Sequence, residues 1–428
     1  MLILRGGRVI DPASERDEIA DVVIEAGRVR SVGRGAGDSI EGEHVVVLDC
    51  SGRWVTPGFL DLHVHLREPG QEYKEDLESG LMAAAAGGFT TVCAMPNTTP
   101  VNDCRAITEA VMARARDIVG ARLSVYGAVT RGSRGEQLTE MADLKDAGAM
   151  GVSDDGVCVM NAAVMRHALE YARTFDLLVS QHCEDHDMTG GAPMNEGPVA
   201  TRLGLRGWPT AAEDVIVARD LILAELTGAR YHVAHLSSLG AVRLIREAKS
   251  RGLPVTAEVT PHHLLLTDEA VLGYRTFCKV NPPLRSEADV EAVREALRDG
   301  TIDCIATDHA PHTSLEKDCE FDVASFGING LEPTLAVMLG LVRDGHLSEH
   351  RLVESLTAAP AKVGKLEGGS LRVGAPADVT VIDPGLQWTV RAEDMLSKSH
   401  NTPWIDQPVT GAVTHTLVAG EVVYTRDP

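Results

Sequence analysis

The pattern of apolar and polar positions divides the chain into three regions. Near the N-terminus, short apolar segments separated by turns lack helical periodicity and predict β-strands at residues 2–11, 21–33 and 44–52. From Thr56 onward, apolar strands alternate with long helical stretches. After about Leu366 the β pattern returns, at residues 377–385, 413–420 and 421–427. We therefore expect a protein of the α/β class.

The central region predicts a barrel. Its strand-like segments cover residues 90–95, 122–129, 177–185, 230–238, 254–263 and 303–312, and its helical segments cover residues 104–119, 136–148, 211–228 and 240–252. Repeated strand–helix units of this length favour a TIM-like (β/α)8 barrel over residues 56–365. Because both terminal regions have the same β pattern, we expect residues 1–55 and 366–428 to pair into one small β-sandwich domain.

Composition narrows the possible partners and location. The 428 residues are 44% apolar, enough for one large domain and a smaller one, and the net charge of −22 argues against binding to nucleic acid or to an anionic membrane. The N-terminal sequence lacks a signal-peptide pattern, and no run of about 18 apolar residues occurs. Eight cysteines without a C-x-x-C pair indicate reduced thiols, so we expect a cytoplasmic protein.

The first strand of the predicted barrel carries candidate chemistry. In "DLHVHLREPG", residues 61–70, His63 and His65 are one residue apart and Arg67 follows. Alternate side chains of a strand point to the same face, so these three side chains can project together. A single His-x-His pair is more often structural than metal-binding, so further ligands are needed.

Polar residues end four other predicted strands. They are Asp154 and Asp155 in "SDDG", His182 in "HCED", His235 in "HLSS" and Asp308 in "ATDHAPH". Barrel enzymes place their active sites at the C-terminal ends of the strands, so these side chains are expected to converge with the His63–His65 pair. Imidazole and carboxylate ligands suit Zn²⁺, with some tolerance for Co²⁺ or Mn²⁺. A carboxylate of "SDDG" could bridge two metals, but the residues alone do not decide between Asp154 and Asp155.

Such a centre is suited to hydrolysis of an amide-like bond. Zn²⁺ lowers the pKa of a bound water and polarises a carbonyl, and the resulting hydroxide attacks that carbonyl. A nearby carboxylate then transfers the proton to the leaving nitrogen. We assign that role to Asp308, because it ends the last strand that faces the metal and need bind the metal only weakly.

Eight motifs taken together resemble a known family. "GFLDLHVHLREPG", "AMPNTTP", "SDDG", "HCED", "HLSS", "TPHHL", "KVNPPLR" and "ATDHAPH" occur in the order found in the amidohydrolase superfamily, specifically in dihydroorotases of the bacterial long-chain type. The resemblance extends over about residues 54–365. It implies a hydrolase of cyclic amides that interconverts L-dihydroorotate and N-carbamoyl-L-aspartate in de novo pyrimidine synthesis.

The resemblance also implies a role for each matching residue. His63 and His65 match the ligands of a first zinc, His182 and His235 those of a second, Asp155 the bridging ligand, and Asp308 the remaining ligand and general base and acid. Arg67, Asn97 and His312 match residues that bind the substrate carboxylate, and Asn281 matches a residue that contacts the ring. One or two zinc ions are expected, with two favoured. Residues 314–335 resemble a family loop that closes over substrate.

Two alternatives stay open from the sequence. Dihydropyrimidinases, hydantoinases and allantoinases also open cyclic amides, but they typically bridge two metals with a carbamylated lysine. Lys145 is the nearest lysine to "SDDG", and it is expected on the preceding helix. An inactive assembly partner of aspartate transcarbamoylase is the second alternative, but such a chain should have lost metal ligands. We expect a homodimer, and association with that enzyme would be compatible with activity.

The remaining histidines are assigned no role in the reaction. His262 and His263 of "TPHHL" end another predicted strand, but the family does not use them as metal ligands, so we expect them to be structural or to support the ligands. His309 is expected to point away from the site. His232 is expected to be an ordinary packing residue.

Overall fold

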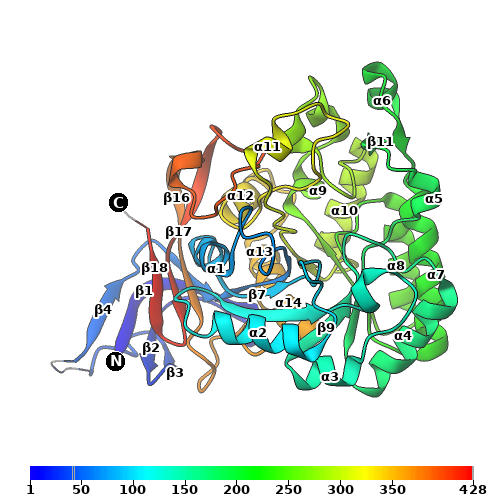
Figure 1. The fold of residues 1–428 in the computed structure, drawn as a ribbon. Helices are drawn as coiled ribbons and strands as arrows, with labels where there is room; N and C mark the ends of the chain where they lie inside the picture. Colours follow the sequence, from blue (N-terminus) through cyan, green and yellow to red (C-terminus); the bar gives the residue numbers. More distant parts are fainter. Residues whose placement is uncertain (41, 43, 427–428) are drawn as a thin grey trace.

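The computed structural model describes residues 1–40, 42 and 44–426. Its central region is a ring of eight parallel strands surrounded by helices (Figure 1). In order around the ring, the strands are β6 (Phe59–Val64), β7 (Phe89–Ala94), β8 (Arg122–Gly127), β9 (Ala149–Ser153), β10 (Leu178–Gln181), β13 (Tyr231–Val233), β14 (Val255–Val259) and β15 (Cys304–Ile305). The ring closes through a single parallel bridge between Val64 and His309.

The helices of the barrel follow the strands along the chain. They are α1 (Leu77–Ala86), α2 (Arg105–Ala115), α3 (Met141–Asp146), α4 (Ala162–Thr174), α7 (Ala211–Thr227), α8 (Leu239–Ser250), α10 (Glu287–Asp299), α12 (Thr334–Arg343), α13 (Glu349–Leu356) and α14 (Ala358–Gly364). Helix α4 shows why they form. The Asn161 side chain caps its first turn, and its buried residues Met165, Ala168, Leu169 and Ala172 recur at helical spacing.

Short elements lie in the connections at the open end of the barrel and around it. The helices are α5 (His186–Thr189), α6 (Pro198–Leu203), α9 (Pro261–Leu265) and α11 (Ser314–Lys317), with a two-stranded sheet of β11 (Met194–Asn195) and β12 (Gly207–Trp208). Among the described residues, 3₁₀ turns cover Pro12–Ser14, Arg131–Ser133, Asp268–Val271, Thr276–Cys278 and Ala392–Asp394.

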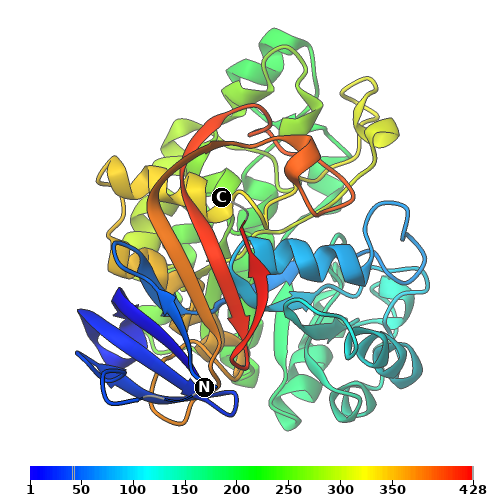
Figure 2. The same ribbon diagram turned by 90° about the vertical axis from the view of Figure 1, so that its left-hand side faces the viewer.

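The two ends of the chain form one mixed sheet beside the barrel (Figure 2). Its strands are β1 (Leu2–Asp11), β2 (Arg16–Glu25), β3 (Arg28–Gly33), β4 (Val46–Asp49), β5 (Trp54–Pro57), β16 (Val379–Thr389), β17 (Pro408–Val418) and β18 (Glu421–Thr425). β5 joins the two halves, because it pairs with β1 on one side and with β16 on the other. Buried Leu4, Val55 and Leu417 share the apolar core of this sheet.

The fold class expected from the sequence is confirmed, and the differences are local. The helix expected over residues 136–148 is shorter, Met141–Asp146, and the strand expected over 303–312 is reduced to Cys304–Ile305. Past Ile305 the regular strand ends, although His309 still bridges to Val64, and Asp308 has a left-handed backbone with φ of 46°. The division into domains at residues 55 and 366 stays a prediction.

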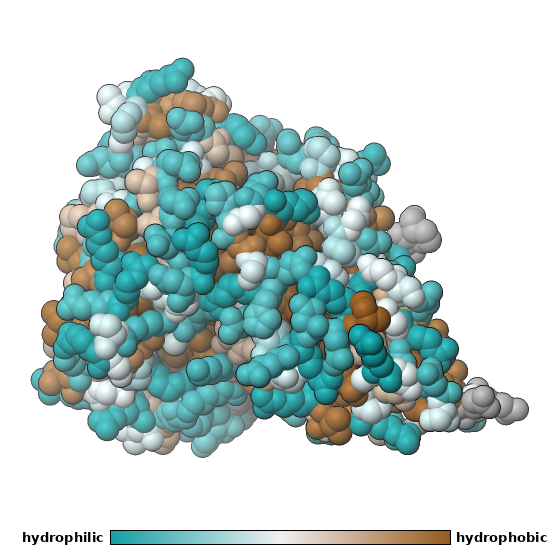
Figure 3. Space-filling model, turned by 180° about the vertical axis from the view of Figure 1, so that it is seen from behind, coloured by the Kyte–Doolittle hydropathy of each residue, from teal (hydrophilic) through white to brown (hydrophobic). Residues whose placement is uncertain are grey.

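The surface seen in one view is mainly polar. Seen from behind, it is mostly hydrophilic with scattered apolar patches (Figure 3). Within the described part of the chain, no helix has both the length and the apolar character needed to cross a membrane.

Candidate active site

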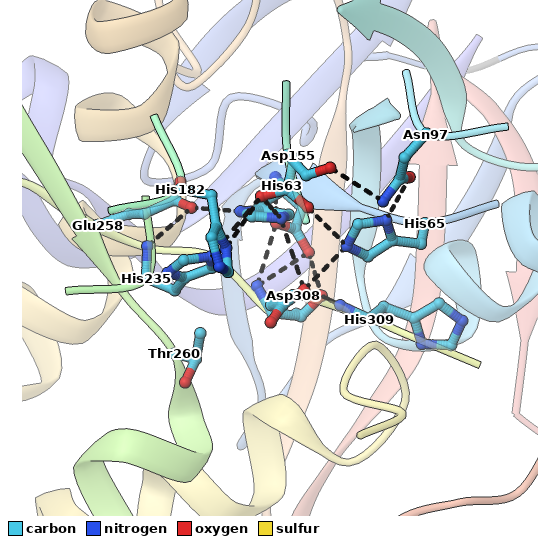
Figure 4. Close-up of polar contacts among 12 residues, drawn as sticks. His63, His65, Asn97, Asp155, His182, His235, Glu258, Thr260, Asp308 and His309 are labelled. Carbon is cyan, nitrogen blue, oxygen red and sulfur yellow. Dashed lines mark hydrogen bonds and ion pairs between the residues drawn. The ribbon is translucent and has the colours of Figure 1, made fainter. Parts of the chain in front are cut away.

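The six residues expected to bind metal lie together at the C-terminal ends of the barrel strands (Figure 4). His63 belongs to β6, His65 follows it, and His182 directly follows β10. Asp155, His235 and Asp308 come two or three residues after β9, β13 and β15. None of the six side chains is more than about 6% exposed. Parallel strands thus bring together residues that are up to 245 positions apart in the sequence.

Asp155 is shared by two groups of potential metal ligands. One group consists of His63, His65 and Asp155, and the other of Asp155, His182 and His235; within each, the ligand atoms lie within 4.8 Å of one another. The Nε2 atoms of His63 and His65 lie 3.3 Å from different oxygens of Asp155. This arrangement has the form of a binuclear site with one carboxylate between two pairs of imidazoles.

Asp308 lies outside both groups but close to the first. Its Oδ1 atom is 3.1 Å from the Nε2 atom of His65 and 3.5 Å from the Nε2 atom of His63. Burial by itself would raise the pKa of Asp308, but the positive field of His63 and the hydrogen bond with His65 outweigh it and lower the pKa below the usual range. Asp308 is therefore a carboxylate at neutral pH.

The residues present fit a divalent cation. The His63 Nε2 and Asp155 Oδ1 atoms are buried and have no hydrogen-bond partner among the described residues, although they lie 3.3 Å apart. The His182 Nδ1 and His235 Nε2 atoms converge to 2.9 Å. Buried polar atoms left without partners are costly, and a metal coordinated by them would remove that cost. Nitrogen and oxygen donors of this kind are the ligands that Zn²⁺ accepts.

A buried glutamate that the sequence reasoning missed orients His63. Glu258 of β14 contacts the His63 Nδ1 atom at 2.7 Å and the His232 Nε2 atom at 3.0 Å. Burial would raise the pKa of Glu258, but the hydrogen bonds with His232 and His63 outweigh it and lower the pKa to about 2. With Nδ1 held by a carboxylate, the Nε2 atom of His63 faces Asp155. The signal was present, because Glu258 is the one charged residue of an apolar strand.

Residues of the sequence motifs make similar supporting contacts to the rings of His65 and His182. Asn97, expected to bind substrate, accepts a hydrogen bond from His65 Nδ1 at 2.9 Å and donates from Nδ2 to the Asp155 carbonyl at 3.4 Å. Glu184 of "HCED" contacts the His182 Nε2 atom at 3.1 Å. Asn97 is thus tied to two metal-binding residues as well as facing the cavity described next.

A cavity of about 460 Å³ opens onto this centre. Nine of the ten predicted site residues line it; His63 is the exception and is fully buried. The Asn281 Nδ2 atom donates to Glu184 at 3.0 Å, and its Oδ1 atom is buried without a hydrogen-bond partner among the described residues. Residues 322–327 also line the cavity, within the loop that the sequence singled out.

Arg67 and His312 form one side of the cavity. Arg67 lies beyond the end of β6 with φ of 62°, so a turn and not strand alternation places it. Its Nε atom donates to the Pro311 carbonyl at 3.2 Å and its Nη2 atom lies 3.3 Å from His312 Nε2. Arg67 is buried and makes no ion pair within 4 Å to any residue that the structure describes. Burial lowers the pKa of Arg67 to about 10, which leaves the guanidinium charged at neutral pH.

The two aspartates of "SDDG" have different surroundings. Asp154 accepts a hydrogen bond from the Thr130 backbone at 3.0 Å and bonds the Thr130 hydroxyl as well, so it holds the turn. Asp155 faces the imidazoles. Lys145, the lysine considered for the alternative bridge, is exposed on α3 and donates to the Phe175 carbonyl. It has no part in the centre.

The remaining histidines behave largely as expected. His309 is turned away from the ligand cluster and its Nε2 atom lies 3.4 Å from Glu75 (Figure 4). His263 contacts Thr260 at 2.7 Å and the Pro282 carbonyl at 3.0 Å, which fixes the turn after β14. His232 is fully buried and paired with Glu258, so it supports the metal-binding side chains more directly than a packing residue would.

Comparisons with known proteins agree with this geometry. A family model described as "Dihydro-orotase-like" matches residues 52–240, and one described as "Amidohydrolase family" matches residues 218–424. The chain is 57% identical over 429 residues to a dihydroorotase of Anaeromyxobacter dehalogenans, with 100% of this chain and 98% of that protein covered. It is 51% identical over 426 residues to a dihydroorotase of Geotalea daltonii, with 100% of both covered. The chain belongs to the dihydroorotase family.

Solved structures show the fold of this member of the dihydroorotase family. An L-hydantoinase (dihydropyrimidinase) of Arthrobacter aurescens aligns with a TM-score of 0.88 and 25% identity, covering 100% of this chain and 96% of that one. A dihydropyrimidinase of Brevibacillus agri aligns with a TM-score of 0.85 and 22% identity, covering 99% and 95%. The chain therefore shares its barrel and terminal sheet with these two enzymes. Identity over the full length places the chain with the dihydroorotases, as the motifs predicted.

Proposed function

We propose that this enzyme interconverts L-dihydroorotate and N-carbamoyl-L-aspartate as a step of de novo pyrimidine synthesis. The observation that carries the proposal is the buried Arg67 guanidinium, which lines the same cavity as the metal-binding groups and makes no ion pair with the described residues. A buried charge without an oppositely charged partner in direct contact is costly. A substrate carboxylate would supply that partner bidentately, whereas a neutral ring would not.

We assign zinc to the site and favour two ions. Two pairs of imidazoles on either side of Asp155 support that number, because each pair with the shared carboxylate offers three protein ligands. Catalytic zinc sites typically have three protein ligands and an open position. A divalent cation held there would lower the pKa of a bound water and polarise the ring carbonyl.

Asp308 is the proposed general base and acid. It lines the same cavity as Arg67, is ionised at neutral pH, and lies 3.1 Å from the His65 Nε2 atom. In ring opening, water adds to the ring carbonyl and the bond from that carbon to nitrogen breaks. The Asp308 carboxylate accepts the proton from the attacking water and delivers it to the ring nitrogen. The reverse sequence closes the ring.

Arg67 and His312 are proposed to hold the substrate carboxylate, and Asn281 the ring. Burial and the charges of Arg67 and Lys74 lower the pKa of His312 well below the usual range, so His312 stays neutral. It can then donate one hydrogen bond without adding charge. The free Asn281 Oδ1 atom can accept from a ring N–H. Asn97 would join the carboxylate side through its Nδ2 group.

The cytoplasmic location, the homodimer and an association with aspartate transcarbamoylase stay predictions. The eight cysteines are free in the structure, six of them buried, which is compatible with a reducing compartment. Size-exclusion chromatography with light scattering, with and without aspartate transcarbamoylase, would test both assemblies.

A substrate panel tests the proposed reaction. Purified, zinc-loaded enzyme would be assayed for ring opening of L-dihydroorotate, dihydrouracil, hydantoin and allantoin. We expect opening of L-dihydroorotate alone, and loss of that activity with a chelator. Preferential opening of a neutral ring would indicate a hydantoinase-type activity instead. If zinc-loaded protein opened no ring, the chain would be better explained as an inactive assembly partner.

A further inference from the structure

A segment of the C-terminal region packs against residues that line the cavity. After the turn Ala392–Asp394, residues 396–404 leave the terminal sheet and pack against the barrel connections. The Ser397 hydroxyl donates to the buried Glu75 carboxylate, and the Ser399 hydroxyl donates to the Lys74 carbonyl at 2.7 Å. Residues far beyond the barrel sequence thus contact the connection that follows β6.

Asn401 is the residue of this segment that approaches the cavity wall. Its side chain is 2% exposed and every polar atom has a partner. Oδ1 accepts from the His312 backbone N–H at 2.9 Å, and Nδ2 donates to the carbonyls of Ala310 and Gly327, each at 3.0 Å. The Asn401 carbonyl accepts from the Asn329 N–H at 3.0 Å. One buried amide therefore joins two separate stretches of chain.

Both stretches belong to the substrate cavity. Ala310, His312 and Gly327 line it, and the Pro311 carbonyl between the first two accepts from Arg67 Nε. Asn401 thus holds the backbone on either side of the carbonyl that aims the guanidinium. It also holds Gly327, the end of the loop 322–327 that lines the cavity.

The approach of these two stretches is close enough to depend on residue type. Gly327 has φ of 148°, and a Cβ atom there would lie 2.7 Å from the Ala310 carbonyl oxygen and 2.8 Å from the His312 ring. The loop can therefore lie this close to residues 310–312 only if position 327 is glycine. The backbone joins these stretches one residue further on, where the Ala310 N–H donates to the Ile328 carbonyl at 3.0 Å. At the close approach itself two carbonyls meet, which do not attract each other, and the Asn401 amide donates to both.

We propose that Asn401 is a positioning residue for substrate recognition. By fixing residues 310–312 against Gly327, it sets the positions of His312 and the Arg67 guanidinium, and so the fit of the cavity to an acidic ring. This inference rests on the proposed function, because it assumes that the Arg67 side receives the substrate carboxylate. It adds a residue of the C-terminal region to an active site otherwise built from barrel strands and connections.

The test compares Asn401 variants with a matched control. Asn401→Ser keeps a small polar side chain that cannot reach all three partners. Asn401→Asp keeps the shape and the acceptor for His312 N–H, but replaces the donor by an oxygen that faces two carbonyls. The control is Asn329→Ser. Asn329 is equally buried and its side chain anchors Ser397 and Ser399 of the same segment, without a side-chain contact to the cavity.

We expect the KM for L-dihydroorotate to rise about tenfold in both Asn401 variants, with kcat within about threefold and metal content unchanged. Such a split is the mark of lost binding that is equal in ground and transition states. In Asn329→Ser we expect a comparable fall in Tm but a KM within about twofold of the parent. If Asn401→Asp does not fold, Asn401→Ser and the control still give the comparison.

Two results would overturn the inference. One is an unchanged KM in folded Asn401 variants of an enzyme that opens L-dihydroorotate. The other is an equal rise of KM in Asn329→Ser, which would mean that any loosening of the segment has this effect. Failure of the unsubstituted enzyme to open L-dihydroorotate would instead contradict the proposed function, and the inference with it.

Discussion

The Oδ1 atom of Asp308 lies 3.1 Å from the Nε2 atom of His65, although the two residues are 243 positions apart. The same Nε2 atom lies 3.3 Å from Asp155, so His65 stands between the two carboxylates. Both aspartates are buried, but only Asp155 is common to the two groups of metal ligands. This difference in position supports the bridging role proposed for Asp155 and the proton-transfer role proposed for Asp308.

Asp308→Ala is expected to remove nearly all turnover and leave metal bound. General acid–base catalysis contributes about 10²- to 10⁴-fold, and a fall in kcat of that order is expected. Four histidines and Asp155 remain as ligands, so metal analysis should show most of the zinc in place. Activity within a few-fold of the parent would contradict the proton-transfer role.

The two adjacent aspartates of "SDDG" allow a matched pair of variants to test the bridging role of Asp155. Asp155→Asn is expected to lower metal content and activity together, because the shared carboxylate loses its charge. Asp154→Asn changes the same functional group one residue away, where the carboxylate accepts hydrogen bonds from Thr130. We expect that variant to keep its metal and to lose stability by about 1 to 3 kcal/mol in denaturant unfolding. Equal metal loss in both variants would show that the turn, and not the bridge, controls binding.

The strand-end residues could be predicted because two regular features place them. The side chains of a strand alternate, which puts His63 and His65 on one face, and a parallel barrel gathers the ends of all its strands. His182 and His235 follow their strands within two residues, so small errors in strand boundaries did not matter. The family resemblance then resolved Asp155 from Asp154, a choice that depends on which side of a turn each carboxylate faces.

The partners of the supporting residues could not be predicted, even where a residue such as Glu258 stood out, because these contacts depend on distances between elements. Glu258 meets His63 across 195 positions, and Asn401 meets His312 across 89. Neither pair has a fixed spacing, and an isolated asparagine in a C-terminal segment has no distinguishing pattern. Strand alternation was an incomplete reason for expecting Arg67 in the site, since the position of Arg67 depends on a left-handed turn beyond β6.

Glu258→Gln is expected to weaken metal binding through His63. Glutamine keeps the size of the side chain but loses the charge that faces the His63 Nδ1 and His232 Nε2 atoms. Loss of such a supporting carboxylate typically costs about 10- to 100-fold in metal affinity. Competition with a chelator of known affinity would measure it. Asp220→Asn removes another fully buried carboxylate, one that pairs with Arg219 and Tyr231 outside the metal groups, and should leave metal affinity unchanged.

Arg67→Lys is expected to raise the KM for L-dihydroorotate about 10- to 100-fold. Lysine keeps the charge but cannot bind a carboxylate bidentately while also contacting Pro311 and His312. Arg166→Lys, on the exposed face of α4 where it pairs with Glu170, should change neither KM nor kcat. A KM equal to that of the parent in Arg67→Lys would exclude Arg67 from carboxylate binding.

The KM of the parent enzyme is expected to be flat between pH 6 and about pH 9. Arg67, with a pKa of about 10, stays charged below that value. Since the pKa of His312 is lowered by burial and by the neighbouring Arg67 and Lys74, lowering the pH to 6 does not protonate it. Initial rates over a series of buffers would give the profile. An inflection near pH 6.5, the ordinary pKa of histidine, would show that His312 is not in the neutral state that the structure indicates.

The position of equilibrium should depend on pH in a direction fixed by the reaction. Ring opening creates a second carboxyl group, which ionises above its pKa of about 4 and releases a proton. The ratio of opened to cyclic compound should therefore rise about tenfold for each pH unit above about pH 5, so acid favours ring closure and alkali favours ring opening. Chromatography of mixtures started from either compound would measure the ratio. Because a catalyst does not move an equilibrium, Arg67→Lys must reach the same ratios more slowly, and equal yields at all pH values would rule out the assigned reaction.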